Sequence, residues 1–349
     1  MKRMGRNRRF VTAAILVVMG GGCAGVEGPS IPDWLIREGP WLVFTRMAGE
    51  KRDICVVSPE EKRVVNITKG RGKNIWPSWS PDGNRVAYAS NRDGNWELYS
   101  VPLSGGGEKR LTRTAEREEA PAWSPDGKWI AFLTGEDEQK DVYLLRIAGT
   151  VDQERTRLTN LPGEKVAAAW SPDGTQAAFE ANVGGRWAIF RVSASGDAPI
   201  RLTESVYDSE TPVWSPDGKK LAFESNRGGN WDIYTMNVDG SDTARLTKNP
   251  GADSNPSWSP DSRRLAFDVV EQGQGEIYVM NADGSGIYNL SRNPADDIGP
   301  QWSPDGKRIA FSSNRDGRYQ IYVTEAEGRE TVQLTHEAGD SKWPYWSPK

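Results

Sequence analysis

Six acidic residues recur along the chain at positions where one architecture would bring their carboxylates together. Each stands five or six residues before a copy of Trp-Ser-Pro. These residues are Glu118, Glu164, Asp208, Asp253, Asp297 and Asp340. The corresponding position ahead of the first copy is Asn74. Carboxylates that lie close together can act in acid and base catalysis, bind a cation such as calcium, or attract a basic partner.

The spacing of the Trp-Ser-Pro copies indicates which elements must position these carboxylates. Successive copies are 44 residues apart, except for one interval of 47 residues. They begin at Trp79, Trp123, Trp170, Trp214, Trp258, Trp302 and Trp346. In the unit 212–247, short β-like runs at 212–215, 220–224, 231–236 and 245–247 alternate with turn signals. Four strands in a 44-residue repeat are typical of a β-propeller blade.

The strand pattern also predicts how the blades pack and how the ring closes. The second run of each unit has a large-Ala-aromatic pattern, as in Leu265-Ala266-Phe267, so each blade can pack on a neighbour through both faces. The chain begins with a second-type run at Trp41 and ends with a lone first-type run at Trp346. We therefore predict an all-β, seven-bladed β-propeller of four-stranded antiparallel blades, closed by pairing the C-terminal strand with the N-terminal blade.

The repeat resembles that of a known family. The strings 302–306 (Trp-Ser-Pro-Asp-Gly), 313–317 (Ser-Asn-Arg-Asp-Gly) and 277–281 (Ile-Tyr-Val-Met-Asn) are similar to the TolB-type propeller repeat. The similarity extends over about residues 41–348. It implies a periplasmic adaptor that binds partner proteins through the propeller. TolB proteins have an α/β domain before a six-bladed propeller, whereas here 17 residues separate Cys23 from Trp41 and seven blades are expected.

Related repeats also occur beside prolyl-oligopeptidase-type hydrolases and in an oligogalacturonate lyase family that depends on histidines and a metal. The chain has no Gly-x-Ser-x-Gly motif, and its single histidine is His336. These features favour neither enzyme class.

The amino terminus has the pattern of an export signal. Five basic residues between Lys2 and Arg9 precede a short apolar run at 10–19 and then Gly20 to Cys23. We expect a signal peptide at 1–22 of the lipoprotein type, lipidation of Cys23, a tether at 23–40 and the propeller at 41–349. Plain secretion and an uncleaved anchor are the alternatives. All three place the body of the protein outside the cytoplasm.

Composition limits the kind of partner. Without the first 22 residues, 39 basic residues stand against 48 acidic ones, which argues against nucleic acid. Cys55, in the apolar run 54–57, is expected to be a buried and inert thiol.

Propeller topology predicts which loops share a face with the six carboxylates, here called the top face. Connections between second and third strands place Arg92, Arg227 and Arg315 there, either paired with the acidic crossovers or binding a ligand. Aromatic residues follow directly, and they could cover a blade edge, stack on a sugar or anchor a protein. These aromatic residues are Trp96, Trp187, Trp231 and Tyr319.

The carboxylates themselves have three candidate roles. They could cap turns in their own crossovers, form a partner-binding ring at a channel mouth, or hold calcium; folding requires no cofactor. We favour a non-catalytic protein-binding propeller that acts as a lipoprotein adaptor or scaffold at the bacterial cell envelope. Its partner would dock on the carboxylates and on the arginines and aromatic residues of the top rim. A glycan-binding or sensing propeller is the alternative, and a hydrolase or lyase that uses channel carboxylates is the third hypothesis.

Overall fold

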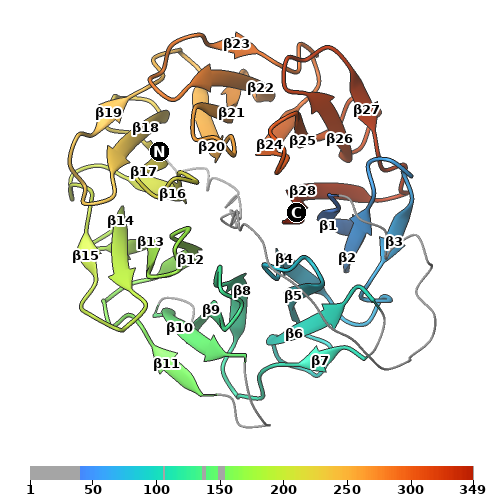
Figure 1. Ribbon diagram of the computed structural model, residues 1–349, viewed down its shortest axis with the longest axis vertical. Coiled ribbons are helices and arrows are strands. Elements are labelled where there is room, and N and C mark those ends of the chain that lie inside the picture. The colour runs from blue at the N-terminus through green and yellow to red at the C-terminus, as the bar shows by residue number, and fades with distance from the viewer. Residues whose placement is uncertain (1–39, 105–106, 136–138, 148–153, 349) are drawn as a thin grey trace, which may run out of the picture.

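The architecture is a ring of seven blades. The structure, a computed structural model, describes residues 40–104, 107–135, 139–147 and 154–348. In these residues the chain forms seven four-stranded antiparallel sheets (Figure 1). In each sheet the innermost strand is the one that ends in the repeat tryptophan. The predicted all-β, seven-bladed propeller is thereby confirmed. The predicted signal peptide, the lipidation of Cys23 and most of the tether lie outside the described residues.

Six blades consist of four consecutive strands each, which follow one another from the centre of the ring outward. They are β4 (Asn74–Trp79), β5 (Arg85–Ser90), β6 (Glu97–Pro102) and β7 (Lys109–Arg110); β8 (Glu118–Trp123), β9 (Trp129–Thr134), β10 (Asp141–Arg146) and β11 (Arg155–Arg157); β12 (Lys165–Trp170), β13 (Gln176–Val183), β14 (Arg186–Ser193) and β15 (Ile200–Arg201); β16 (Ser209–Trp214), β17 (Lys220–Ser225), β18 (Asp232–Asn237) and β19 (Ala244–Arg245); β20 (Ala252–Trp258), β21 (Arg264–Glu271), β22 (Gln274–Asn281) and β23 (Tyr288–Asn289); β24 (Asp297–Trp302), β25 (Arg308–Ser313), β26 (Gln320–Glu325) and β27 (Thr331–Gln333).

The seventh blade is built from both ends of the chain. Its inner strand is β28 (Asp340–Trp346), followed by β1 (Leu42–Ala48), β2 (Lys51–Val57) and β3 (Val64–Asn66). Leu42 pairs with Trp346, and the Trp41 amide donates to the Ser347 hydroxyl at 2.8 Å. The Ser347 amide donates in return to the Trp41 carbonyl at 2.7 Å. The predicted closure is confirmed.

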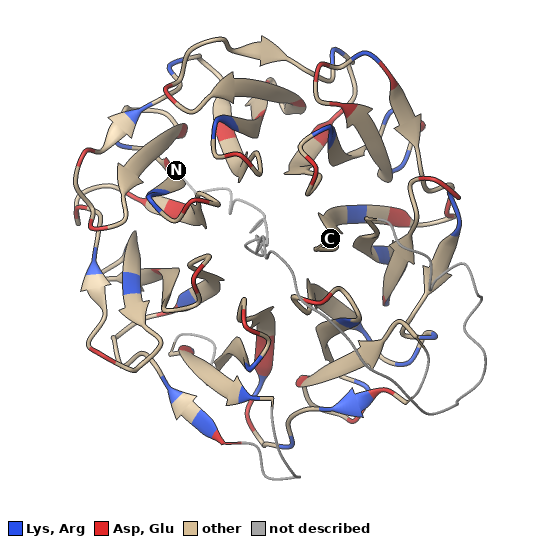
Figure 2. Cartoon of the chain, viewed as in Figure 1, with Lys and Arg blue, Asp and Glu red and all other residues tan. Residues whose placement is uncertain are grey.

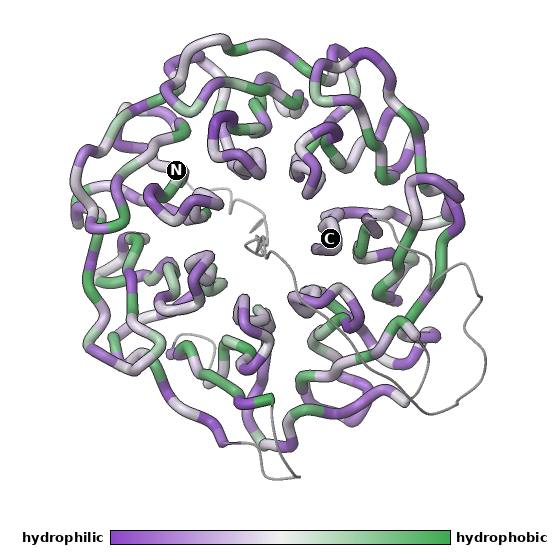
Figure 3. Tube along the Cα trace, in the orientation of Figure 1, coloured by the Kyte–Doolittle hydropathy of each residue, from purple (hydrophilic) through white to green (hydrophobic). Residues whose placement is uncertain are grey.

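The core lies between blades. Alternate residues of the second strand point to opposite faces, so Phe223 of β17 packs on Tyr234 of β18 at 5.7 Å between ring centroids, while Ala222 faces the other neighbour. Figure 3 shows hydrophobic residues along the middle strands of the blades. Every described blade therefore buries both of its faces against neighbours, as the large-Ala-aromatic pattern predicts.

The Ser-Pro-Asp-Gly turns join the first and second strands. In the turn after β16, the Ser215 hydroxyl donates to Asp217 at 2.7 Å and accepts the Lys220 amide at 2.9 Å. The same serine-to-aspartate bond occurs in six turns. These aspartates are turn residues, as predicted.

Each inner strand contains a bulge three residues before its tryptophan. The residue there has a positive φ between 33° and 65°, and the pairing with the second strand shifts register around it. These residues are Trp76, Ala120, Ala167, Thr211, Asn255, Gly299 and Trp343. The inner strands continue beyond the bulge, so β16 begins at Ser209 and not at Pro212 as predicted. Three or four residues expected in each crossover therefore belong to a strand.

The Cys55 thiol is expected to resist modification in the folded protein. Burial raises its pKa to about 12, and its side chain is fully enclosed in the blade that closes the ring. In a Cys23→Ser variant, dithionitrobenzoate should react with about one thiol per chain in urea and with almost none in buffer. Rapid reaction in buffer at pH 8 would show that this blade opens.

Candidate functional site

The six predicted carboxylates do not form one ring, because they occupy two different strand positions. Three stand five residues before the repeat tryptophan, on the inner strands β8, β20 and β24 (Figure 2). They are Glu118, Asp253 and Asp297, and each is 0% exposed. The other three stand one residue earlier and are only half-buried: Glu164, Asp208 and Asp340. Adjacent positions of an extended chain point to opposite sides, so the six acids are not equivalent members of one ring, which was one of the three roles considered for them.

The buried set lies between blades. Glu118 accepts from the Thr114 hydroxyl and from Arg155, each at 3.1 Å. Asp253 accepts from the Asn249 amide group at 2.8 and 2.9 Å. Burial, and then the charge of Glu97, raises the pKa of Glu118 to about 7.

Burial has the same effect on the other two members of this set. It raises the pKa of Asp253 to about 6, with the charges of Asp232 and Asp268 adding to it. Burial also raises the pKa of Asp297, against hydrogen bonds and the charge of Arg315. These carboxyls have unusual pKa values, but they are closed off from solvent.

The half-buried set includes residues that cap strands. Asp208 accepts the Trp187 amide at 3.1 Å and the Asn226 side-chain amide at 3.1 Å. Asp340 accepts the Tyr319 amide at 3.2 Å. These bonds reach residues 18 to 21 positions away and tie the crossover to neighbouring strands and loops, so they are not the predicted capping of a turn within the same crossover. Partner contact by this set stays a prediction.

The three arginines of the top face turn into their own blades. The Arg315 guanidinium lies 3.2 Å from Asp297, which is the predicted pairing with an acidic residue. Arg92 and Arg227 reach the same strand position, where they bond Asn74 at 3.0 Å and the Ser209 hydroxyl at 3.4 Å.

Each of these guanidiniums also lies over an aromatic ring of its blade. The distances to the ring centroids are 4.5 Å for Arg92 over Tyr99, 5.1 Å for Arg227 over Tyr234 and 4.5 Å for Arg315 over Tyr322. These internal contacts make the arginines part of the blade structure.

The aromatic residues expected on the rim are all partly buried. Trp96 packs on Trp76 with ring centroids 6.3 Å apart, and the Arg117 guanidinium lies 5.5 Å from it. The Lys342 ammonium lies 3.3 Å from the Tyr319 ring centroid. Trp231 directly precedes β18, and Trp187 lies near the start of β14. Side chains of the protein thus contact the rings of Trp96 and Tyr319, which does not favour sugar stacking on them.

Sequence reasoning treated the repeat tryptophans as strand residues and missed their role in joining blades. In five described copies the indole N–H donates to a carbonyl of the preceding inner strand, at 3.0 to 3.3 Å. The Trp214 indole, for example, reaches the Ala169 carbonyl. That carbonyl lies on the unpaired inner edge of its sheet, so the bond satisfies an edge group and ties two blades together.

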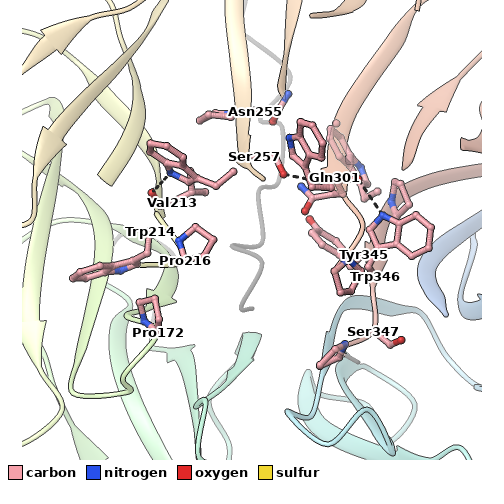
Figure 4. A pocket seen from close by; sticks show the side chains of 18 of the residues that line it. Pro172, Val213, Trp214, Pro216, Asn255, Ser257, Gln301, Tyr345, Trp346 and Ser347 are labelled. Carbon is pink, nitrogen blue, oxygen red and sulfur yellow. Dashed lines mark hydrogen bonds between the residues drawn. The ribbon is translucent and has the colours of Figure 1, made fainter. Parts of the chain in front are cut away.

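The tryptophans and the prolines that follow them line a pocket at the centre of the ring (Figure 4). It encloses about 80 Å³ and is bounded by β12, β16, β20, β24, β28 and the residues after them. Residues labelled in Figure 4 include Pro172, Trp214, Pro216, Asn255, Gln301 and Tyr345. No charged side chain lines it. Such a surface suits an uncharged, apolar segment rather than an ion.

Two further properties bear on what the described part of the chain can bind. No group of three or more His, Cys, Asp or Glu residues within 40–104, 107–135, 139–147 and 154–348 is arranged to hold a metal ion. In the same ranges, no helix has the length and apolar character needed to cross a membrane.

These features define the chain as a seven-bladed β-propeller of Trp-Ser-Pro repeats with an aromatic pocket at its centre. The family model described as "TolB beta propeller domain" matches residues 30–142, 113–251 and 245–349. The chain belongs to that family, as the resemblance of its repeats implied.

The individual proteins to which this chain is similar differ from one another in function. A TolB homologue of Chlorobium luteolum is 33% identical over 81 residues, which are 23% of this chain and 18% of that protein. The crystal structure of TolB from Acinetobacter baumannii has a TM-score of 0.59 at 21% identity, covering 91% of this chain and 85% of the other. A puromycin-hydrolysing peptidase of Mycobacterium tuberculosis has a TM-score of 0.68 at 13% identity, covering 84% and 53%.

The two structural similarities demonstrate a shared fold. The sequence match to the Chlorobium protein spans less than a fifth of that protein. Activities and partners of these proteins are therefore transferred to this chain only as proposals.

Proposed function

We propose that the protein is a non-catalytic adaptor or scaffold of the bacterial cell envelope, which binds a segment of a partner protein at the centre of its ring. The observation that carries the proposal is the pocket of Trp and Pro residues without a charged side chain. Aromatic residues in a desolvated pocket provide most of the binding energy in many protein interfaces. Asp340 begins β28 and Asp208 precedes β16, and the pocket is lined by the far ends of these two strands; Asp208 is paired with Arg186 at 3.1 Å.

The pKa pattern supports a non-catalytic role. A catalytic acid or base must come within hydrogen-bonding reach of its substrate. Glu118, Asp253 and Asp297 have raised pKa values but are fully buried, and they do not line the central pocket. Export is supported by the pattern of basic, apolar and small residues before Cys23, which would carry the lipid anchor.

Replacing Gln301 by Arg is expected to lower partner capture at least tenfold. Gln301 contributes its side chain to the pocket, while its backbone carbonyl accepts the Trp346 indole, so the change adds a charge and keeps the bond between blades. An unpaired charge in a desolvated interface costs at least about 1.4 kcal/mol, or tenfold in affinity. The assay is affinity capture from solubilised envelopes, with the retained protein quantified by mass spectrometry.

The matched control is Gln274→Arg, which adds the same charge at an exposed position. We expect the wild-type chain and this control to retain the same protein, and Gln301→Arg to retain at least tenfold less. Equal retention by all three chains would place the contact outside the pocket. Retention of no specific protein would contradict the adaptor proposal, and a glycan array would then test the alternative.

A further inference from the structure

The same three strand positions recur at every described junction between neighbouring blades, and their residues are here called the seam triad. Its members are the residue at or near the start of the third strand, the Thr or Ser that follows the outer strand, and the inner-strand residue of the next blade five positions before its tryptophan. Along the chain the triads are Asp53, Thr68 and Asn74 (β2/β4); Glu97, Thr112 and Glu118 (β6/β8); Asp141, Thr159 and Lys165 (β10/β12); Ala188, Thr203 and Ser209 (β14/β16); Asp232, Thr247 and Asp253 (β18/β20); Glu276, Ser291 and Asp297 (β22/β24); and Gln320, Thr335 and Ser341 (β26/β28).

The β10/β12 triad shows how opposite charges satisfy a seam. The Lys165 ammonium lies 3.0 Å from Asp141, and the Thr159 hydroxyl donates to the same carboxylate at 2.7 Å. Both ends of this contact are buried, and their charges compensate each other.

Three other seams place two carboxyls opposite each other, and among these β6/β8 is the one in which both carboxyls have an oxygen without a hydrogen-bond partner. Glu97 and Glu118 are each 0% exposed, and each has one carboxylate oxygen without a hydrogen-bond partner. A buried, unpartnered carboxylate oxygen is costly, and a second carboxylate beside it adds repulsion. The Glu97–Glu118 pair should therefore be more stable when one of its carboxyls is protonated.

Two guanidiniums approach this pair from outside. Arg110 lies 2.8 Å from Glu97, and the more exposed Arg155 lies 3.1 Å from Glu118. Arg110 is shared, because it also contacts Asp93, which accepts from the Tyr99 hydroxyl. Other ionisable groups nearby pair away from Glu97 and Glu118: Glu119 with Lys140 and Arg117, Lys165 with Asp141, and Tyr88 with Glu108 and Arg92. Glu116 accepts from the Thr134 hydroxyl, and Lys109 and Arg113 are exposed. Arg85 lies at the far end of β5, and β4 and β9 contain no ionisable residue. The cations beside the pair are thus the partly exposed Arg110 and the exposed Arg155.

We propose that the β6/β8 seam is a proton-controlled latch in the ring, held closed when the Glu97–Glu118 pair carries a proton and loosened when that proton is released to solvent. Protonation of one carboxyl removes the repulsion and turns one of the unpartnered oxygens into a donor. Release of the proton leaves two buried carboxylates opposite each other between two blades. The β10/β12 seam, which has Lys165 in place of the second acid, stays closed in both conditions.

The direction of the pH dependence follows from the pKa of Glu118, which burial and the charge of Glu97 raise above its ordinary value of 4.5 to about 7. The folded chain then binds more protons than the unfolded chain between these values. This contribution to stability is complete below pH 4.5 and is lost as pH rises through 7. Acidification from pH 8 to pH 6 should therefore tighten the seam.

The test is urea unfolding of the full chain between pH 5.5 and pH 8, compared with Glu118→Gln and with the control Asp53→Asn. Asp53 has the same position as Glu97, but its seam partner is the uncharged Asn74. The folding equilibrium constant of the wild type should fall on the order of tenfold more over this pH range than that of Glu118→Gln. Asp53→Asn should keep the wild-type slope. Glu118→Lys, which copies the β10/β12 arrangement, should also show the flattened slope.

Equal pH slopes for wild type and Glu118→Gln would overturn the latch, as would an equal flattening by Asp53→Asn. Should the Glu118 variants fail to fold, carboxyl ¹³C NMR of the wild-type chain labelled at glutamate decides the question. We expect one glutamate resonance to titrate above pH 6, and its absence would contradict the proposal.

Discussion

A chain that stops at Gly339 is expected to lose the cooperative fold of the propeller. It would lack β28, so β1 would have no inner partner and the blade formed from both termini would be incomplete. Trp346, buried between blades in the same strand, would also be missing, and loss of such a side chain alone costs about 3–5 kcal/mol. That cost is comparable with the total stability of about 5–15 kcal/mol of an ordinary domain. Urea unfolding followed by circular dichroism should show a broad transition at low denaturant.

A chain that stops at Ser347 is the matched control for this truncation. It keeps β28 and the two hydrogen bonds between Trp41 and Ser347, so it should unfold close to the wild-type midpoint. A synthetic peptide of residues 340–349, added in excess to the shorter chain, should restore a cooperative transition. An unchanged midpoint in the chain ending at Gly339 would show that the closing blade contributes little.

Replacing Lys165 by Met should cost about 3 kcal/mol of unfolding free energy. The Lys165 side chain is buried, and its ammonium contacts Asp141 at 3.0 Å and the Gly163 carbonyl at 2.9 Å. Methionine fills similar space but leaves Asp141 with one cation fewer in a buried seam. The remaining contact of Asp141 with Arg157 limits the loss. Urea unfolding at pH 7 measures it.

The double variant Asp141→Asn with Lys165→Met tests whether this loss comes from charge. Removing both partners leaves no uncompensated buried charge in the pair, so the double variant should lose at least about 1 kcal/mol less than the sum of the single losses. Additive losses would attribute the effect of Lys165→Met to packing alone.

The ring and its closure could be predicted because they depend on patterns that the sequence repeats. Four short runs in each 44-residue unit, with a lone first strand at the end, leave few alternatives to a propeller closed by both termini. The alternation of the second strand in Leu265-Ala266-Phe267 likewise follows from period two alone.

The environment of the acidic residues could not be predicted in this way. Trp76, Ala120 and Asn255 share a left-handed bulge although their side chains have nothing in common. The bulge extends the inner strand, so the positions five and six residues before the tryptophan have different environments. The sequence prediction had treated these two positions as equivalent. A proline follows the bulge residue in six of the seven inner strands, and proline within a sheet is typical of a bulge. That signal could have indicated the irregularity.

The tryptophan bonds between blades were missed for a different reason. The Trp214 indole donates to the carbonyl of Ala169, which lies 45 residues earlier in the chain. Every residue type supplies a backbone carbonyl, so no sequence pattern marks the acceptor. Only the placement of one blade against the next reveals the bond.

The blade shared by both termini also determines when the ring can form during biosynthesis. Trp41 and Ser347 are 306 residues apart, so β1 must wait for β28 to leave the ribosome or, for an exported chain, to cross the membrane. Contacts so distant in sequence form slowly, and an unpaired β1 edge can aggregate in the meantime. A prematurely terminated chain can stack its blades but cannot join its ends, which gives cellular proteases a means of distinguishing incomplete products from finished ones.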